Sequence, residues 1–389
     1  MNHHEILRFT QIEEVPDSVW CDLTNPGSLF TTRDWSLTLR RSNQTVPVEF
    51  WAIRDRSGCL LGIPVHVYPE APARSTYDVW SLHRHDFEPT SGSMHRSRRH
   101  VLIGTRNGQR NGFLHSRRPH DPKLVGSLLQ AIAEEHRTSV VSMLYLDRTL
   151  LETVRDQLDG WHAGFSDAAA ELRVPTGETG IDSFLDTVPD SRTRGRIRAE
   201  LRAVADEPPA VRIEDVNEIE ALAPTLAPLL VKLNQRHGQP ADEASMAAYI
   251  RASANSGLRP QLIITGGLTE PKAFSLSVRD SHLMSVRAVG LDDERLGNRA
   301  KDYPRVLVHE PLAYAMRSGI QAVDLGVGAL YAKMLRGATA VPLYSLVRIP
   351  HDLGVTVVPG GDRKRLDELH VASPKLSDTT LREWAVDCG

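Results

Sequence analysis

The chain has 389 residues, of which 41% are hydrophobic and 24% are charged, and its formal net charge at pH 7 is −3. This length is typical of two or three domains with hydrophobic cores, and the slight negative charge argues against nucleic-acid binding over the whole surface. No apolar run is long enough to cross a membrane, and three scattered cysteines form neither a disulfide framework nor a metal site. The N-terminus lacks the apolar segment of a secretory signal, so we predict a cytoplasmic protein.

The first half of the chain predicts a β-hairpin, a helix and a strand, in that order. Alternating apolar residues in 46–55 and 60–69 flank a short turn and predict the hairpin. A helix is expected from Asp121-Pro122, because an aspartate cap followed by proline is typical of a helix start. The apolar segment 139–146 predicts the next strand.

The second half repeats this order. Segments 258–265, 272–280 and 283–291 predict a three-stranded meander, a helix is expected from Tyr303-Pro304, and a strand follows before Gly326. Pro311 lies inside this helix and predicts a kink or a distorted turn. The repeat indicates an α/β fold of mixed sheets in two modules, with predicted boundaries at 1–172 and 173–389.

A run of arginines lies between the two predicted modules. Segment 191–204 has five arginines within eleven residues and a single glutamate. Ile197, Leu201 and Val204 recur at helical spacing, which predicts a surface helix packed along that edge. Another face of this helix carries Arg194, Arg198 and Arg202. These side chains indicate either a phosphate-binding surface or a solvated helix, and the sequence leaves both open.

Two glycines and a lysine follow the last strand of the second module, in "GVGALYAKMLRGA" (residues 326–338). Gly326 and Gly328 predict a turn with positive φ angles. The spacing does not fit the phosphate loop G-x-x-x-x-G-K-[ST], so a nucleotide-binding loop of that kind is not expected.

An ordered series of short motifs surrounds this stretch. A helix expected to end at Gly319 leads to a strand ending in Asp324-Leu325-Gly326, then to Tyr331-Ala332-Lys333, and then to Arg336-Gly337. This order resembles the last third of Fem-type transferases and their relatives in the GNAT superfamily of acyltransferases. Ala332 departs from the family pattern, in which the tyrosine and the lysine are often adjacent. Softer matches at 28–35, 191–204 and 229–238 extend the resemblance over residues 28 to 348.

The resemblance implies two GNAT-like modules in tandem and transfer of an acyl or aminoacyl group to the amine of a small molecule, such as a cell-wall or antibiotic intermediate. The donor in such proteins is aminoacyl-tRNA or acyl-coenzyme A. We predict aminoacyl-tRNA as co-substrate, with no tightly bound cofactor, because of the arginine-rich helix. Acyl-coenzyme A is the alternative donor. A non-catalytic binding protein of the same fold is the alternative from another class.

Lys333 and Asp324 are the predicted catalytic residues. Lys333 would stabilise the negative charge of the tetrahedral oxygen or hold a donor phosphate, or else be a solvated lysine. Asp324 would accept the proton of the amine, or else cap the following turn. The residues predicted to bind the phosphates of the donor are Arg336, Arg299, Lys301, Arg194, Arg198 and Arg202. Those predicted to bind the substrate are Tyr331, Tyr303 and His237. For Arg336, an ion pair with Asp324 is an equal alternative.

Two further segments are weaker candidates. His83, His85, Asp86 and Glu88 have side chains that bind metals, but without a second cluster a polar loop is favoured, and no metal site is predicted. The loop 104–114 matches only the first half of the coenzyme A motif [QR]-x-x-G-x-[GA], which loosely favours a donor other than coenzyme A.

Overall fold

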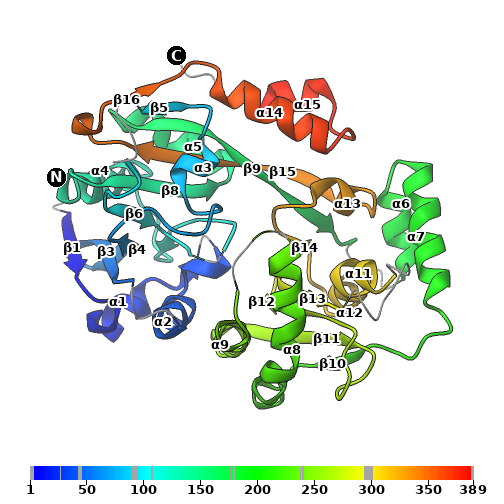
Figure 1. Cartoon of the computed structure of the whole chain (residues 1–389). Coiled ribbons are helices and arrows are strands. Elements are labelled where there is room, and N and C mark those ends of the chain that lie inside the picture. Colours follow the sequence, from blue (N-terminus) through cyan, green and yellow to red (C-terminus); the bar gives the residue numbers. More distant parts are fainter. Residues whose placement is uncertain are drawn as a thin grey trace. The chain divides into compact units, whose positions relative to one another are not determined.

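The computed structural model forms two compact units (Figure 1). It describes residues 4–26, 28–42, 46–89, 95–106, 108–175, 177, 180–236, 238, 241–292 and 301–386. Unit 1 comprises residues 1–168 and 342–389, and unit 2 comprises residues 169–341. The predicted mixed α/β fold is confirmed. The predicted second module, 173–389, covers most of unit 2 together with the C-terminal segment that is grouped with unit 1.

Unit 1 contains a mixed sheet in which β6 and β8 are parallel neighbours. Its strand order is β1 (Glu5–Phe9), β3 (Val48–Asp55), β4 (Gly58–Tyr68), β6 (His100–Ile103), β8 (Val140–Leu146), β15 (Thr339–Arg348) and β9 (His162–Arg173). The short strands are β2 (Asn25–Pro26), β5 (Phe87–Pro89), β7 (Leu114–His115) and β16 (Val355–Val357). The predicted hairpin is the antiparallel pair of β3 and β4.

The helices of unit 1 include the one predicted from Asp121-Pro122, which is α4 (Lys123–Glu135). The other α-helices are α1 (Asp17–Asp22), α2 (Arg33–Ser42), α3 (Val79–Leu82), α5 (Arg148–Val154), α14 (Gly361–Ala372) and α15 (Asp378–Trp384). Within the described residues, 3₁₀ turns include η1 (Ile12–Glu14), η2 (Leu29–Thr31), η4 (Arg155–Gln157) and η6 (His351–Leu353). Apolar residues of η1 and α1 pack against Phe50 and Ala52 of β3, which forms one part of the core.

Unit 2 contains the predicted meander, with β13 and β14 as parallel neighbours. Its strands are β10 (Val211–Ile213), β11 (Arg259–Thr265), β12 (Ala273–Arg279), β13 (Leu283–Leu291) and β14 (Ala322–Asp324), with the end of β9 beside β14. Its helices are α6 (Ile181–Thr187), α7 (Ser191–Ala203), α8 (Val216–Arg236), α9 (Glu243–Ala254), α11 (Asp302–Pro304), α12 (Glu310–Arg317) and α13 (Leu330–Met334).

Helices cover both faces of the unit 2 sheet. Leu262, Leu276 and Ala288 pack against apolar residues of α8 and α9. Ile263 points to the opposite face and packs with Val306, from the helical segment that follows β13. Successive residues of a strand point to opposite faces, so neighbouring positions in β11 supply the two layers of the core.

The helical segment between β13 and β14 contains one π-helical turn, η5 (Arg305–His309), between α11 and α12. Pro311 lies at the start of α12 and has no N–H to donate to the carbonyl group four residues earlier. The predicted distortion near Pro311 is therefore confirmed. Such turns occur often at functional sites. Here the turn ends at His309, whose side chain contacts α7.

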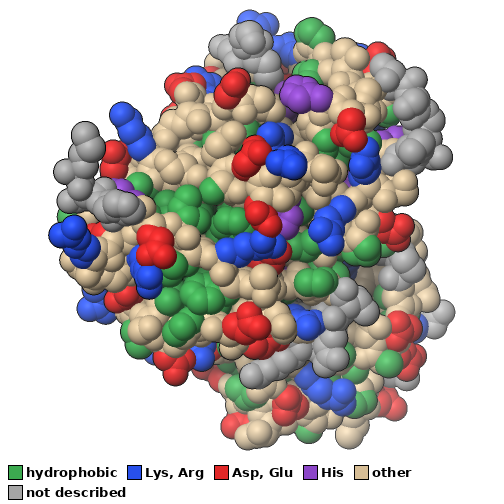
Figure 2. All heavy atoms as spheres, turned by 90° about the vertical axis from the view of Figure 1, so that its left-hand side faces the viewer, with side chains coloured by type: hydrophobic (Ala, Val, Ile, Leu, Met, Phe, Trp, Pro, Cys, Tyr) green, Lys and Arg blue, Asp and Glu red, His purple; other side chains and the backbone are tan. Residues whose placement is uncertain are grey.

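The surface carries both signs of charge. On the face drawn in Figure 2, lysine and arginine side chains lie interspersed with aspartate and glutamate. This mixture agrees with the small net charge of the chain. The five arginines within residues 192–202 of α7 are a local concentration of positive charge along the sequence. Within the described residues, no helix is both long and apolar enough to span a bilayer.

A buried carboxylate in unit 1 predicts a pH dependence of stability. Glu49 accepts hydrogen bonds from Arg8 (2.8 Å), Trp51 (2.8 Å) and His136 (3.2 Å). Burial alone would raise the pKa of Glu49, but these hydrogen bonds lower it from 4.5 to about 2. A lowered pKa stabilises the fold above the unfolded value and loses that effect as the pH falls from about 4.5 to about 2. We expect the stability of Glu49→Gln, followed by circular dichroism during acid unfolding, to depend less on pH in this range than that of the wild type. An unchanged pH profile would contradict this.

Candidate functional site

The predicted arginine-rich helix is α7. The carboxylate of Asp190 caps its first turn by accepting from the amide of Arg192 (3.0 Å), and Ile197 is buried on its packed edge. Arg194 turns back and donates to the carbonyl oxygens of Val188 (2.6 Å) and Pro189 (3.0 Å). Arg194 therefore fixes the start of the helix. Four further arginines are exposed: Arg192, Arg196, Arg198 and Arg202.

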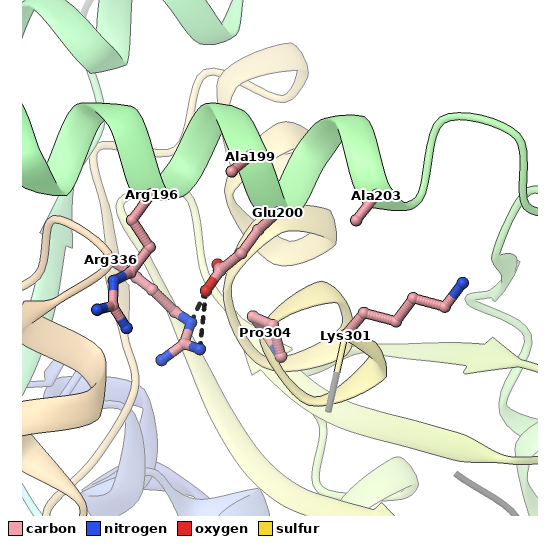
Figure 3. A pocket seen from close by; sticks show the side chains of 7 residues that line it. All are labelled: Arg196, Ala199, Glu200, Ala203, Lys301, Pro304 and Arg336. Atoms are coloured by element: carbon pink, nitrogen blue, oxygen red, sulfur yellow. Dashed lines mark hydrogen bonds and ion pairs between the residues drawn. The ribbon is translucent and has the colours of Figure 1, made fainter. Parts of the chain in front are cut away.

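One face of α7 lines a cavity of about 570 Å³. The lining residues are Arg196, Ala199, Glu200, Ala203, Lys301, Pro304 and Arg336 (Figure 3). The four residues from α7 follow helical spacing, so they share one face of the helix. Two alanines on that face leave room between the helix and the chain opposite. Lys301 and Pro304 come from the start of the segment after β13, and Arg336 follows α13.

Two of the three cations in this pocket are paired with carboxylates. Arg336 forms a two-point ion pair with Glu200, with Nη2–Oε1 at 2.9 Å and Nε–Oε2 at 3.2 Å. Lys301 forms an ion pair with Glu207. Arg196 has no ion-pair partner among the described residues. The lining thus has more positive than negative charge, as a phosphate site requires.

Glu200 has a second partner in the π-helical turn. The Nε2 atom of His309 lies 2.9 Å from Oε2 of Glu200. Burial alone would raise the pKa of Glu200, but the hydrogen bond from His309 and the charge of Arg336 lower it. His309 is 5% exposed, and its Nδ1 atom has no hydrogen-bond partner among the described residues. The glutamate is therefore an anion held between two donors.

Two of the predicted donor-binding residues meet in this pocket. Arg336 and Lys301 line it, whereas Arg194, Arg198 and Arg202 lie on α7 outside the lining. Arg299 and His237 lie outside the described residues. Tyr303 is partly buried beside Ile263 and Val306, and burial raises its pKa, whereas Tyr331 is exposed on α13. The alternative ion pair of Arg336 with Asp324 is wrong, because Glu200 takes that place.

Arg196, Glu200 and His309 were not among the site residues predicted from the sequence. Glu200 was visible as the one acidic residue among five arginines. A single carboxylate on an otherwise basic helix indicates an ion pair with a cation of the same protein, and this pattern could have identified Glu200. The position of His309 depends on the π-helical turn, which the sequence located only as a distortion near Pro311.

Lys333 is buried and holds the loop after β14. Its Nζ atom donates to the carbonyl oxygens of Leu325 (2.8 Å), Gly326 (3.0 Å) and Val327 (3.1 Å). An ammonium group has three protons, which matches these three acceptors in number. Lys333 is 5% exposed, so the alternative of a solvated lysine is wrong. In this arrangement, the lysine orders the loop.

Asp324 lies at the end of β14 and is 1% exposed. Its Oδ1 atom accepts from the amide of Gly326 (2.9 Å), and its Oδ2 atom accepts from Ser285 (3.1 Å) on β13. These contacts are those of a turn cap, which was one of the two roles considered for this residue. Gly326 has a φ angle of 72°, as predicted for the turn. Asp324 and Lys333 therefore fix the same loop from two sides.

Asn111, in the loop 104–114 of unit 1, forms hydrogen bonds to the backbone near the ends of two strands. Asn111 is buried and donates from Nδ2 to the carbonyl oxygens of Ile103 (2.9 Å) and Leu144 (3.1 Å), near the ends of the parallel strands β6 and β8. Its Oδ1 atom accepts from the amide of Gly112 (2.9 Å). An internal amide thus occupies backbone acceptors at this edge, which favours unit 2 as the location of the ligand site.

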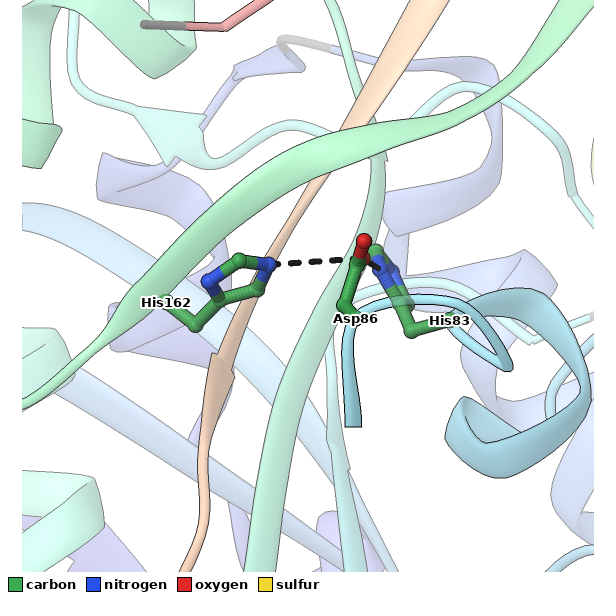
Figure 4. Close-up of side chains that lie close together, drawn as sticks. All are labelled: His83, Asp86 and His162. Atoms are coloured by element: carbon green, nitrogen blue, oxygen red, sulfur yellow. Dashed lines mark hydrogen bonds and ion pairs between the residues drawn. The ribbon is translucent and has the colours of Figure 1, made fainter. Parts of the chain in front are cut away.

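A buried cluster in unit 1 consists of His83, Asp86 and His162 (Figure 4). The His83 Nδ1 atom lies 2.6 Å from Oδ2 of Asp86, and His162 Nε2 lies 3.3 Å from the same atom. Nη1 of Arg365 also lies 2.6 Å from that oxygen. The guanidinium therefore supplies the positive charge that a metal ion would supply to this carboxylate. His83 and Asp86 belong to the core, and not to the polar loop that the sequence favoured.

No family model and no curated protein sequence matches the chain. The solved structures that share its fold include two with TM-scores above 0.5. FemX matches with a TM-score of 0.57 and 10% identity, covering 90% of this chain and 98% of FemX. The C-terminal domain (DUF2156) of a protein described as a lysylphosphatidylglycerol synthetase from Agrobacterium fabrum matches with a TM-score of 0.51 and 11% identity, covering 88% and 93%. The chain therefore has the fold of FemX, as the motifs of its C-terminal third predicted.

Proposed function

We propose that the chain is an N-acyltransferase that moves an aminoacyl group from a charged tRNA to the amine of a small molecule. The observation that carries the proposal is the cationic pocket on α7, in a chain with the fold of FemX. Acyl transfer needs the phosphates of the donor to be held while the amine attacks its carbonyl carbon. Arg196, Lys301 and Arg336 are proposed to bind these phosphates.

The exposed arginines of α7 favour tRNA over a smaller donor. Arg198 and Arg202 lie on the helix outside the pocket lining and are exposed. A donor with phosphates only inside the pocket would not reach them, whereas a tRNA backbone continues beyond it. Contacts of this kind make binding depend steeply on salt concentration.

Acyl-coenzyme A is the second candidate donor. Lys301 and Pro304 lie at the beginning of the helical segment that follows β13. This arrangement resembles that of a GNAT module, which holds the pyrophosphate of coenzyme A at the start of a helix. The same pocket would then hold that pyrophosphate. Binding measurements with both donors decide between them.

The proposal is tested with Arg196→Gln, because Arg196 lines the pocket and has no ion-pair partner among the described residues. The wild-type protein is titrated with aminoacylated tRNA and with coenzyme A by isothermal titration calorimetry. We expect tRNA binding that weakens with salt and becomes about five- to tenfold weaker in Arg196→Gln.

Arg251→Gln is the matched control, because Arg251 is an exposed arginine on α9 and does not line the pocket. This variant is expected to bind tRNA like the wild type. Tight binding of coenzyme A without any binding of tRNA would replace the first proposal by the second. Equal weakening in both variants would remove the pocket as the site. Absence of transfer with either donor would favour a non-catalytic binding protein.

A further inference from the structure

The pocket on α7 contains counter-ions of its own. Glu200 pairs with Arg336 through both oxygens, and Glu207 pairs with Lys301. A phosphate that enters the pocket competes with these carboxylates for the same cations. The two glutamates are therefore placed to affect the affinity of the pocket for anions directly.

We propose that Glu200 and Glu207 are displaceable internal anions, and that the pocket has two phosphate subsites, one at Arg336 and one at Lys301. This inference rests on the proposed function of the pocket as a phosphate site. The ligand class that follows is one with two or more phosphate groups in a row, as a polyphosphate chain or as successive phosphodiesters. Such a ligand displaces both carboxylates, whereas a single phosphate displaces one.

The shape of the pocket separates the two subsites. Figure 3 shows Arg336 and Glu200 facing each other at one end of the labelled group, with Lys301 directed toward the other end near Ala203. On α7, the lining extends from Arg196 to Ala203, a distance of roughly 10 Å along the helix at 1.5 Å per residue. Arg336 and Lys301 lie toward opposite ends of this lining, so one phosphate subsite is assigned to each.

Glu200 can release Arg336 without becoming an unpaired anion. Its Oε2 atom keeps the hydrogen bond to Nε2 of His309 (2.9 Å) when the guanidinium moves to a ligand. This matters because the side chain of Glu200 is only 18% exposed, and a buried carboxylate without a partner is costly. Glu207 is 36% exposed, so solvent replaces Lys301 when that pair opens.

The test compares inorganic phosphate and inorganic tripolyphosphate as probes. Their dissociation constants are measured by isothermal titration calorimetry for the wild type, Glu200→Gln, Glu207→Gln and the double variant. We expect each single change to tighten tripolyphosphate binding about three- to fivefold, and the double change to tighten it by about the product of the two factors. For phosphate, the double variant is expected to gain no more than the better single variant.

Glu243→Gln is the control for the change in net charge, because Glu243 is an exposed glutamate on α9 that does not line the pocket. It is expected to leave both dissociation constants unchanged. Unchanged or weaker tripolyphosphate binding in the two acid variants would overturn the inference. If the double variant also gained affinity for inorganic phosphate by the product of the two single factors, the assignment of two separate subsites would be wrong. If Glu200→Gln does not fold, the tripolyphosphate affinity of Glu207→Gln alone decides, because the Glu207 side chain is more exposed than that of Glu200 (36% against 18%).

Coenzyme A and a short RNA ending in 3′-CCA, tested in the same variants, distinguish the source of the phosphates. Tighter binding of one of them in both acid variants identifies the ligand that spans the two subsites. If the acid variants tighten tripolyphosphate but neither donor binds, the inference stands and the proposed function fails. If a donor binds and depends on Arg196 but not on Glu200 or Glu207, the proposed function stands and the inference fails.

Discussion

Arg365→Met is expected to lower the free energy of unfolding by about 3–5 kcal/mol, because it removes the cation from a buried charge cluster. Arg365 is 5% exposed and pairs with Asp86 (2.6 Å) and with Asp362. Both carboxylates are buried, so the methionine variant leaves two negative charges without their cation. Urea unfolding followed by circular dichroism measures the loss.

Arg98→Met is the matched control. Arg98 also pairs with an aspartate in unit 1, Asp352, but that pair is at the surface. Exposed pairs contribute about 0–1 kcal/mol, so a small change is expected. Equal effects of the two substitutions would contradict the assignment of Arg365 as the cation of a buried cluster.

The same cluster predicts how the variant responds to acid. Burial alone would raise the pKa of Asp86, but hydrogen bonds from His162 and His83 and the charge of Arg365 hold it well below its usual range. In the wild type, this carboxylate stabilises the fold above its unfolded pKa and loses that effect as the pH falls. In Arg365→Met, the aspartates lack their cation, so their protonation relieves repulsion. Moderate acid is therefore expected to narrow the stability difference between the variant and the wild type.

Lys333→Met is expected to lower the free energy of unfolding by about 3 kcal/mol, because it removes the three hydrogen bonds that the Lys333 ammonium donates to backbone carbonyl oxygens. These are the carbonyls of residues 325–327, which form the loop after β14. Methionine has a similar length, so the change removes hydrogen bonds with little loss of packing. Lys272→Met, at an exposed lysine of unit 2, is the control and is expected to have no effect.

Activity measurements on the same variant separate ordering of the loop from chemistry. If Lys333 acts only through the loop, acyl transfer per folded molecule falls together with donor affinity. If it stabilises the tetrahedral oxygen, as the family resemblance implied, kcat falls while KM for the donor is unchanged. Full stability of Lys333→Met would refute the structural role.

The elements of the fold followed from local patterns in the sequence. The hairpin of β3 and β4, the starts of α4 and α7, and the distortion near Pro311 each depend on residues close together in the chain. The pairing of Arg336 with Glu200 joins residues 136 positions apart. The residues around Arg336 do not indicate that Glu200 is its partner, and those around Glu200 do not indicate Arg336. From the sequence, the alternative partner considered for Arg336 was therefore the nearby Asp324.

Burial decided the roles that the sequence left open. Lys333 and Asp324 are polar residues next to glycines, a context that fits a catalytic loop and a turn equally well. Their hydrogen bonds became known only from the positions of the loop carbonyls and of Ser285. Likewise, the sequence around His83 and Asp86 is polar and favoured an exposed loop. Their burial depends on Arg365, which lies 279 residues after Asp86 and so gives no local signal in that segment.

Two strands determine how the halves of this chain can be studied separately. Residues 169–341 form one continuous insert that begins within β9 and ends within β15, two strands that are neighbours in the sheet. A deletion at either terminus therefore cannot isolate unit 1, since its residues come from both ends of the chain. A fragment of unit 1 requires excision of the insert and a short linker from Ala168 to Pro342. Unit 2, by contrast, can be encoded as a single open reading frame without rearrangement.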